Sequence, residues 1–229
     1  MTVVAVTSLL LEARIAVGPG ISVICGPASQ LVTSLQAAIE RGALGIISFG
    51  VAGGLVPHLG PGDWVIGSGV RTSDERYPAD RRWSHRLLKA IPGSVRAEIA
   101  GADAPIACSS DKIRLHALTG AMAVDMESHI AAKVAALNHV PFVVCRTVID
   151  ALNRDLPPAA VIELRHDGTP DLLAISRSVI SVIRSQNGKR RRLATLAAKC
   201  ECRVSKLQIS FQEGVALLAT RVSLHTPTL

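Results

Sequence analysis

Several residues of the 229-residue sequence have the types and the positions needed for chemistry at the ends of strands. Glu12 follows a short β-rich run, the glycine-rich segment Gly50–Leu55 follows a second apolar run, and Asp150 follows a third. Two more carboxylates lie within Asp125–Glu127, next to a helical pattern. Carboxyl groups can carry protons or accept hydrogen bonds from hydroxyl groups, and glycines let a ligand approach the backbone closely.

Each of these features has a simpler explanation when it stands alone. Glycine-rich turns are common, and Gly50–Leu55 matches neither a P-loop, which needs a following Gly-Lys-Ser/Thr, nor a Rossmann fingerprint. Carboxylates in the first turn of a helix are ordinarily surface residues favoured by the helix dipole. An aspartate such as Asp150 at a strand exit is more often a loop cap than a catalyst. Only the combination and order of these features indicate a function.

Alternating apolar patterns predict the elements that would position these residues. Strands are expected at Thr2–Ser8, Ile21–Cys25, Gly45–Phe49, Asp63–Val70 and Pro141–Val148. Helices are expected from Pro27 to about Arg41, over Trp83–Ile91, from Ser109 by N-capping, over Met126–Leu137 and over Asp171–Val182, while Arg71–Arg82 is polar and turn-rich. The alternation predicts an α/β fold of three layers, αβα, with a central, mostly parallel mixed sheet. Ligands of such sheets bind at the carboxyl ends of the strands.

Composition divides the chain into two parts. Only 3% of the residues are aromatic, so the core must consist of Val, Ile, Leu and Ala, as in a parallel sheet covered on both faces. Residues 1–183 contain 16 Lys and Arg against 16 Asp and Glu, whereas residues 184–229 contain 9 against 2. The formal net charge of +7 therefore lies in the tail. We predict a catalytic domain over residues 1–183 and a basic C-terminal extension over residues 184–229.

The basic extension is open to more than one interpretation. It can contact nucleic acid or an anionic membrane, or it can be a solvated, poorly ordered end. Scarce aromatic residues argue against a protein that stacks bases, so we expect no nucleic-acid partner and keep a peripheral membrane contact as the alternative. The N-terminus lacks a cationic segment and no run of about 18 apolar residues exists, which places the protein in the cytoplasm, free or at the inner face of the membrane.

Cysteine and histidine spacing predicts no metal site. The five cysteines show no small-scaffold pattern, and Cys200-Glu201-Cys202 lacks a second pair of ligands. Cys25 and Cys145 lie in apolar strand-like runs and are expected to be reduced core residues. The histidines show no metal-ligand spacing, and His129 is expected to be structural.

Three phrases in one order resemble a known family. They are Gly50-Val-Ala-Gly-Gly-Leu55, Ala123-Val-Asp-Met-Glu-Ser128 and Pro141-Phe-Val-Val-Cys-Arg-Thr-Val-Ile-Asp150. Together they resemble the signature series of the nucleoside phosphorylase superfamily, which includes the methylthioadenosine/S-adenosylhomocysteine nucleosidases. The resemblance covers residues 2–182 and implies an enzyme that cleaves the N-glycosidic bond of a purine nucleoside.

Within this superfamily the chain looks most similar to the hopanoid-associated phosphorylases. Leu11-Glu-Ala-Arg-Ile-Ala16, the segment from Gly45 to Leu55 and Ala123-Val-Asp-Met-Glu-Ser-His129 carry that similarity. It implies removal of adenine from adenosylhopane, a nucleoside with a triterpenoid at its 5′ carbon. A methylthioadenosine/S-adenosylhomocysteine nucleosidase and a general purine nucleoside phosphorylase stay open as alternatives.

The resemblance also implies roles for individual residues. Asp150 matches the acid that protonates or hydrogen-bonds the purine, which requires a pKa raised by burial. Glu12 matches the base that activates water in the nucleosidases. Glu127 matches the carboxylate that accepts both ribose hydroxyls, and Met126 would lie against the sugar. The remaining expected substrate contacts are Val51, Gly53 and Asp125.

The acceptor of the ribosyl group is undecided between water and phosphate. No cofactor is implied, but inorganic phosphate would be a co-substrate in phosphorolysis. Arg14 or Arg41 would then be candidates to bind it. Arg146, central in an apolar strand, should be paired if buried; it either orients Glu127 or Asp150 or forms a structural ion pair. A small-molecule nucleoside, lipid-linked in the hopanoid case, is the expected partner, and a homo-oligomer is the expected assembly.

Several residues depart from the family pattern. Ile149 stands where the family usually has Ser beside the acid, and Val51 stands where many nucleosidases have Ser. The stretch from Ala104 to Ile106 lacks the aromatic residue that relatives place against adenine. These departures suit a bulky substrate, but they equally suit a weakened enzyme or a non-catalytic nucleoside-binding protein, for which Ile149 is the best support. A third class is a module tethered to lipid or nucleic acid through its basic tail.

Overall fold

The structure is a computed structural model, and it describes residues 2–155. The strands are β1 (Thr2–Thr7), β2 (Ile21–Cys25), β3 (Ala43–Gly54), β4 (Trp64–Arg71), β5 (Arg76–Pro78), β6 (Val95–Gly101), β7 (Ala123–Asp125) and β8 (Phe142–Asp150). The helices are α1 (Leu10–Ala16), α2 (Ala28–Glu40), α3 (Arg81–Ala90), α4 (Ser109–Thr119) and α5 (Ser128–Leu137). The helix expected at Asp171–Val182 and the domain boundary expected after residue 183 lie outside the described residues.

The eight described strands form one sheet in which five of them close into a ring. β3 pairs with β8, β8 with β4, β4 with β6, β6 with β7, and β7 returns to β3. β1 and then β2 extend the sheet beyond β3, and β5 extends it beyond β4. The pairings along the chain are parallel except for β3–β7, β4–β5 and β4–β8, which confirms the predicted mostly parallel mixed sheet.

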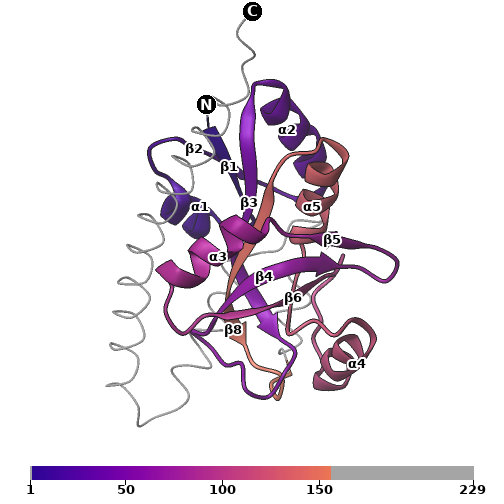
Figure 1. Cartoon of the computed structure of the whole chain (residues 1–229). Coiled ribbons are helices and arrows are strands. Elements are labelled where there is room, and N and C mark those ends of the chain that lie inside the picture. The colour runs from indigo at the N-terminus through magenta and orange to yellow at the C-terminus, as the bar shows by residue number, and fades with distance from the viewer. Residues whose placement is uncertain (1, 156–229) are drawn as a thin grey trace, which may run out of the picture.

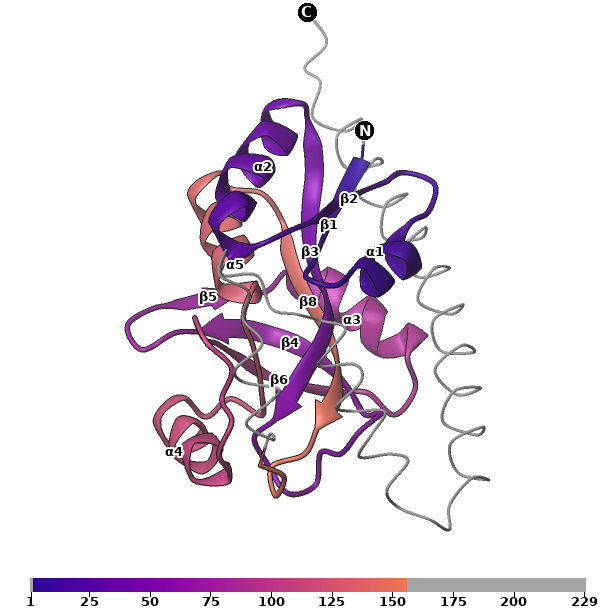
Figure 2. The ribbon, with the colours of Figure 1, turned by 180° about the vertical axis from the view of Figure 1, so that it is seen from behind.

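Helices cover the sheet on both faces, as the αβα prediction requires (Figure 1). On one face, Leu35 of α2 and Ala131 of α5 belong to a core cluster with side chains from β1, β3, β4, β6 and β8. On the other face, Ala16 of α1 packs with Trp83 and Leu87 of α3 against a second cluster. Figure 2 shows the same layers from behind, with the carboxyl ends of β3 and β8 side by side.

Four elements were not expected from the sequence: α1, β5, β6 and β7. α1 begins only three residues after β1 ends, and its seven residues follow Ser8 and Leu9 directly. β6 lies in a stretch that the apolar pattern left unassigned, and it pairs with both β4 and β7. The segment expected to be turn-rich contains β5 and the start of α3, where the side chain of Asp80 accepts a hydrogen bond from the Trp83 backbone N–H over 2.8 Å.

Two predicted helix starts were displaced. The helix expected from Met126 begins at Ser128, because Ala123–Asp125 is the strand β7 and occupies the ladder between β3 and β6. The helix expected to be N-capped by Ser109 includes that serine, and its N-cap residue is Cys108, which makes no capping hydrogen bond through its side chain. Cys145 is a buried free thiol, as predicted, whereas the free thiol of Cys25 is only partly buried.

Candidate active site

The pairing of β3 with β8 brings the predicted site residues together at the carboxyl ends of both strands. Gly50 lies opposite Arg146 and Gly53 lies opposite Asp150. A Cβ at residue 50 would lie 2.5 Å from Nη1 of Arg146 and 2.5 Å from Oε1 of Glu12. Gly50 is therefore needed because two charged side chains occupy the space beside its backbone. The sequence had indicated close approach of a ligand at this glycine instead.

Glu12 is buried, and its carboxylate is held by backbone N–H groups from two segments. Oε1 accepts a hydrogen bond from the Val51 N–H over 2.8 Å. Oε2 accepts hydrogen bonds from the N–H groups of Ser8 (3.1 Å) and Leu9 (2.9 Å). The last two donors belong to the residues before α1, so Glu12 caps its own helix. This carboxylate thus ties the start of α1 to β3, and Val51 contributes through its backbone.

Arg146 is fully buried and sits among three carboxylates. Its Nε lies 2.6 Å from Oδ2 of Asp125, and its Nη2 lies 3.7 Å from Oε2 of Glu127. Nη2 also donates hydrogen bonds to the hydroxyl oxygens of Ser48 (2.6 Å) and Ser128 (3.1 Å). Burial opposes the charge of Arg146, but Asp125, Glu127 and Glu12 together raise its pKa above the usual value. The guanidinium therefore stays charged and neutralises part of the carboxylate cluster.

Asp125 is engaged entirely within the protein. Its Oδ1 accepts hydrogen bonds from the backbone N–H groups of Glu127 (3.2 Å) and Ser128 (2.9 Å) at the start of α5. Its Oδ2 accepts one from the Ser128 hydroxyl and faces Arg146. Both oxygens of the expected substrate contact are thus used to fix α5 and Arg146, which leaves no acceptor for a ligand. Asp125 supports the site from behind.

Glu127 combines burial with an available oxygen. Among the described residues its carboxylate has one ion-pair partner, Arg146, and accepts a hydrogen bond from the Met126 backbone. Burial raises the pKa of Glu127 to about 7; Arg146 lowers it, and the nearby Asp125 and Glu12 raise it further. A buried carboxylate with so few partners is costly, so a ligand that brings hydroxyl groups to it would be favoured. Met126, next to it, is half-buried.

Asp150 ends β8 at a β-bulge. The register with β3 shifts between Ala52 and Gly53, so that Ile149 has no partner and Asp150 lies opposite Gly53. Bulges re-aim side chains near active sites, and here Oδ2 of Asp150 points toward Gly53, 3.8 Å from where a Cβ would lie. Burial raises the pKa of the Asp150 carboxyl, against the lowering effect of Lys112 and Arg154. This direction agrees with the raised pKa expected for a proton donor.

Lys112 is the site residue that the sequence interpretation missed. Its side chain is 0% exposed and its Nζ lies 2.5 Å from Oδ2 of Asp150. A lysine in the first turn of a helix with exposed neighbours gives no sign in the sequence that it is buried. The contact becomes visible only when α4 is placed against the residues that follow β8.

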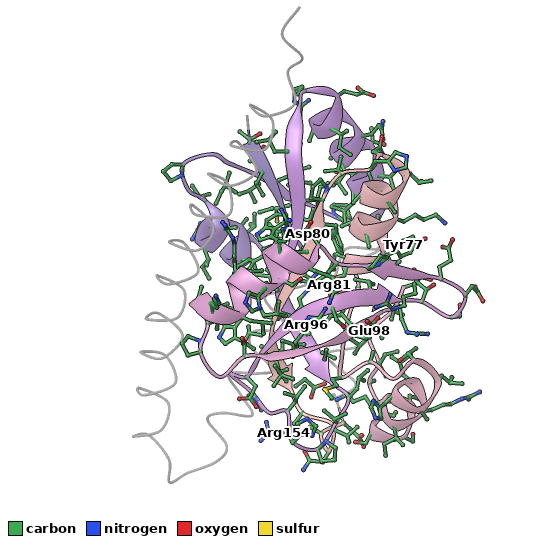
Figure 3. All side chains as sticks on the ribbon, viewed as in Figure 1. Tyr77, Asp80, Arg81, Arg96, Glu98 and Arg154 are labelled. Atoms are coloured by element: carbon green, nitrogen blue, oxygen red, sulfur yellow. The ribbon has the colours of Figure 1, made fainter. Side chains whose placement is uncertain are left out.

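The expected arginine ligands of phosphate lie elsewhere. Arg14 is exposed on α1, and its position two residues after Glu12 turns it to another side of the helix. Arg41 is exposed at the end of α2. Figure 3 labels Glu98 of β6, which pairs with Arg76 over 2.7 Å, and Arg154 beyond β8. Only Arg146, among the described arginines, enters the carboxylate cluster.

The described part of the chain has neither a cluster of metal ligands nor a membrane-spanning helix. Residues 2–155 contain no group of three or more His, Cys, Asp or Glu side chains that could hold a metal ion. His129 contacts Asp103 through Nε2 over 3.1 Å and packs against the backbone of Gly101. No described helix has the length and apolar character to cross a membrane.

The family match defines one class of protein, an enzyme that cleaves glycosidic bonds. The chain belongs to the phosphorylase superfamily, whose family model matches residues 5–181. This confirms the family expected from the sequence phrases. The hopanoid-associated group is not reached by the comparisons and stays a prediction. No curated protein matches the sequence.

Solved structures of similar fold are nucleosidases and a hydrolase. The 5′-methylthioadenosine/S-adenosylhomocysteine nucleosidase of Campylobacter jejuni has 16% identity and a TM-score of 0.60, over 79% of this chain and 95% of that chain. Futalosine hydrolase of Helicobacter pylori has 15% identity and a TM-score of 0.61, over 79% and 97%. The S-adenosylhomocysteine nucleosidase of Streptococcus pyogenes, in complex with 5-methylthiotubericidin, has 15% identity and a TM-score of 0.66, over 93% and 96%. At these identities the likeness establishes the fold.

Proposed function

We propose that the protein hydrolyses the N-glycosidic bond of a 5′-modified adenine nucleoside. Asp150 donates the proton that the departing base needs, Glu127 accepts hydrogen bonds from the ribose hydroxyls, and Glu12 activates the water. The support is that Glu127 and Glu12 both act on Arg146 of β8, while Asp150 ends the same strand opposite Gly53, within a chain of the phosphorylase superfamily. Met126, Val51 and Gly53 complete the proposed substrate contacts, and Asp125 supports them from within the protein.

The proposed reaction balances with one water molecule. As the bond between C1′ and the purine nitrogen breaks, its electron pair goes to the base and the Asp150 proton passes to a ring nitrogen. The sugar, which has oxocarbenium character at this stage, is captured at C1′ by the water oxygen. Glu12 takes the proton that the water releases. The products are adenine and the free 5′-modified ribose, and exchange of protons with solvent restores Asp150 and Glu12.

Water is favoured over phosphate by the charges around Arg146. Asp125, Glu127 and Glu12 all act on this one guanidinium. A phosphate dianion would need additional charge-assisted donors in the same place, and Arg14 is exposed on α1. A neutral water molecule meets no such opposition. The excess of carboxylates over cations is the single observation that carries the hydrolytic proposal.

We further propose adenosylhopane as the substrate, on the resemblance of the segments around Glu12, Gly50 and Glu127 to the hopanoid-associated phosphorylases. The absence of an aromatic side chain between Ala104 and Ile106 leaves less bulk beside the base, which suits a large nucleoside. The second candidate is methylthioadenosine or S-adenosylhomocysteine, because the structures of similar fold include nucleosidases with those names.

Product analysis tests both levels of the proposal. Full-length protein is incubated with adenosylhopane, with methylthioadenosine or with S-adenosylhomocysteine, each in buffer with and without inorganic phosphate. Adenine and a free sugar in phosphate-free buffer support hydrolysis. A ribose-1-phosphate product formed only with phosphate would overturn it. Adenosylhopane consumed faster than the other two nucleosides supports the finer assignment, and the reverse order replaces it with the second candidate.

We also propose that the basic extension, residues 184–229, holds the enzyme at anionic membrane surfaces where a lipid-linked nucleoside resides. The support is that this extension contains 9 Lys and Arg against 2 Asp and Glu, while the preceding chain is neutral. Each basic residue near such a surface contributes about 1 kcal/mol at most. Sedimentation with phosphatidylserine vesicles should exceed that with phosphatidylcholine vesicles and should fall with added salt. Equal sedimentation with both would contradict the proposal.

A further inference from the structure

α4 presents an unusual residue to the interior. Within this helix Lys112 is the one buried residue, at 0% exposure, while its neighbours Asp111 and Ile113 are exposed. A lysine is almost never fully buried unless its charge is paired. The residue that α4 buries is therefore a lysine, and the partners of its ammonium group should explain why Lys112 is buried.

Three acceptors use all the hydrogen atoms of this ammonium group. Nζ donates to Oδ2 of Asp150 (2.5 Å), to the carbonyl oxygen of Ala151 (3.0 Å) and to that of Arg154 (2.9 Å). An ammonium has three N–H donors, so none is left for a ligand. All three acceptors lie at the end of β8 or directly after it. Lys112 thus fixes the backbone that follows the proposed acid as well as the acid itself.

A second contact joins the same two segments. Oδ1 of Asp155 accepts hydrogen bonds from the backbone N–H and the hydroxyl of Ser109, each over 2.7 Å. Ser109 is the first residue of α4, so Asp155 satisfies a free N–H at the start of the helix. The segment from Asp150 to Asp155 is therefore attached to α4 at both of its ends. The two attachments hold the acid in one orientation.

We propose that Lys112 is a positioning residue of the glycosidase reaction, which orients the Asp150 carboxyl and stabilises the carboxylate left behind when its proton passes to the base. This inference rests on the proposed function. Oδ2 is committed to Lys112, while Oδ1 of Asp150 makes no hydrogen bond with residues 2–155 and is the oxygen free to face the purine. When the glycosidic electron pair leaves with the base and Oδ1 gives up its proton, the new negative charge forms beside the ammonium.

The charges facing Asp150 set how pH should report this role. Lys112 reaches it from α4, and Arg154 and Asp155 act on it from the segment after β8. Lys112 and Arg154 lower the pKa of Asp150, whereas burial, as the largest effect, and Asp155 raise it. Activity that requires protonated Asp150 falls as the pH rises through its pKa. Removing the ammonium should move this falling limb to higher pH and weaken the acid.

The test compares pH profiles of adenine release by full-length variants. Lys112→Gln keeps a side-chain donor for the carbonyls but removes the charge, and Lys112→Met removes both. We expect kcat to fall roughly 10²-fold in each, in line with the cost of misplacing a reacting group. The falling limb should move to higher pH in both, and KM should rise more in Lys112→Met. Lys133→Met is the matched control, because Lys133 is an exposed lysine of α5 paired with Glu75.

The outcomes separate this inference from the proposed function. Variants of Lys112 whose falling limb stays at the wild-type pH would overturn the inference, even if their rates drop. If the wild-type protein releases no adenine, the proposed function fails, and ¹³C NMR titration of the Asp150 carboxyl carbon then tests the pair directly. A titration midpoint that moves to higher pH in Lys112→Gln supports the pair, and an unmoved midpoint overturns it. If Lys112→Met does not fold, the same NMR measurement with Lys112→Gln alone tests the pairing of Lys112 with Asp150.

Discussion

Val51 donates its backbone N–H to Oε1 of Glu12 over 2.8 Å, so a carboxylate near the start of the chain is oriented by the strand that carries the glycine-rich segment. The donor is a backbone group, so the side chain at position 51 does not affect it. The family resemblance leads one to expect a serine at this position, and that serine is therefore not needed to hold Glu12. The departure at Val51 removes a hydroxyl but leaves the orientation of the proposed base intact.

The first prediction concerns Glu12→Gln. The amide oxygen can still accept the Val51 N–H, so the fold should be kept while the proton acceptor is lost. Adenine release in phosphate-free buffer should fall by about 10²–10⁴-fold. Chromatography of released adenine measures the rate, and circular dichroism checks the fold. An active Glu12→Gln variant with strict dependence on phosphate would contradict hydrolysis and leave glycosidic cleavage itself standing.

The second prediction concerns Asp150→Asn. An amide cannot donate an acidic proton to the leaving base, so kcat should fall by about 10²–10⁴-fold with little change in substrate affinity. Asp74→Asn, in an exposed turn, is the matched control and should keep the wild-type rate. Single-turnover kinetics separate binding from bond cleavage. Wild-type kcat in Asp150→Asn would move the proposed acid to another residue.

The third prediction uses the crowding at Gly50. In Gly50→Ala the new methyl group would lie 2.5 Å from both Arg146 and Glu12, and residue 50 has a φ of 154° that few side chains adopt. We expect loss of activity and destabilisation of about 1–3 kcal/mol, as for other overpacked sites. Gly60→Ala, with no atom within 4 Å of the added methyl group, is the control. Urea unfolding measures both, and equal stability of the two variants would refute the crowding.

The fourth prediction follows from Glu127. Burial raises its pKa from 4.5 to about 7, so the folded protein keeps a proton that the unfolded chain has released between these values. The stability contribution of this proton is present below pH 4.5 and is lost as the pH rises through about 7. Urea unfolding between pH 4.5 and 8 should therefore show wild-type stability falling relative to Glu127→Gln. A constant difference between the two proteins would mean that Glu127 titrates normally.

Ligand binding should follow the opposite course with pH. Ionised Glu127 is the better acceptor for the ribose hydroxyls, so affinity for an uncleavable adenosine analogue should increase as the pH rises through about 7. Isothermal titration of wild-type protein and Glu127→Gln measures this, with the variant expected to bind weakly at every pH. Affinity that falls with rising pH would exclude Glu127 as the diol acceptor.

The sequence predicted the long apolar elements well and the short ones poorly. β1, β2, α2, β4 and β8 have clear apolar periods. The signature phrases led to Glu127 and Asp150, and the segment Leu11–Ala16 led to Glu12. α1 was missed because its N-terminal capping comes from the side chain of Glu12, at a residue already inside the helix. β7 has three residues, too few for a period to be recognised. Because β7 pairs with β3 and β6, α5 begins at Ser128 and not at Met126, where the helical pattern begins.

The residues proposed for the site were chosen from the sequence, but the contacts between them were not predicted. Arg146 was expected to pair if buried, and the structure identifies Asp125 and Glu127 as its partners. The spacing in the sequence could not show which carboxylates pair with Arg146, because the pairing depends on the path of the chain from β7 to α5. The role of Lys112 could not be predicted for a related reason, since its partner Asp150 lies 38 residues away in the sequence. Contacts between distant segments are set by the register of strands, which a single apolar pattern does not reveal.

The position of β8 in the strand ring has a consequence for the chain as it is synthesised. β3 and β4 follow one another in the sequence, yet β8 pairs with both of them, so the ring stays open until residues 142–150 have been made. The same strand carries Arg146 and Asp150. A nascent chain that ends before β8 therefore has an unpaired strand edge and lacks both of these site residues. Closure of the ring and the appearance of both proposed site residues therefore coincide during translation.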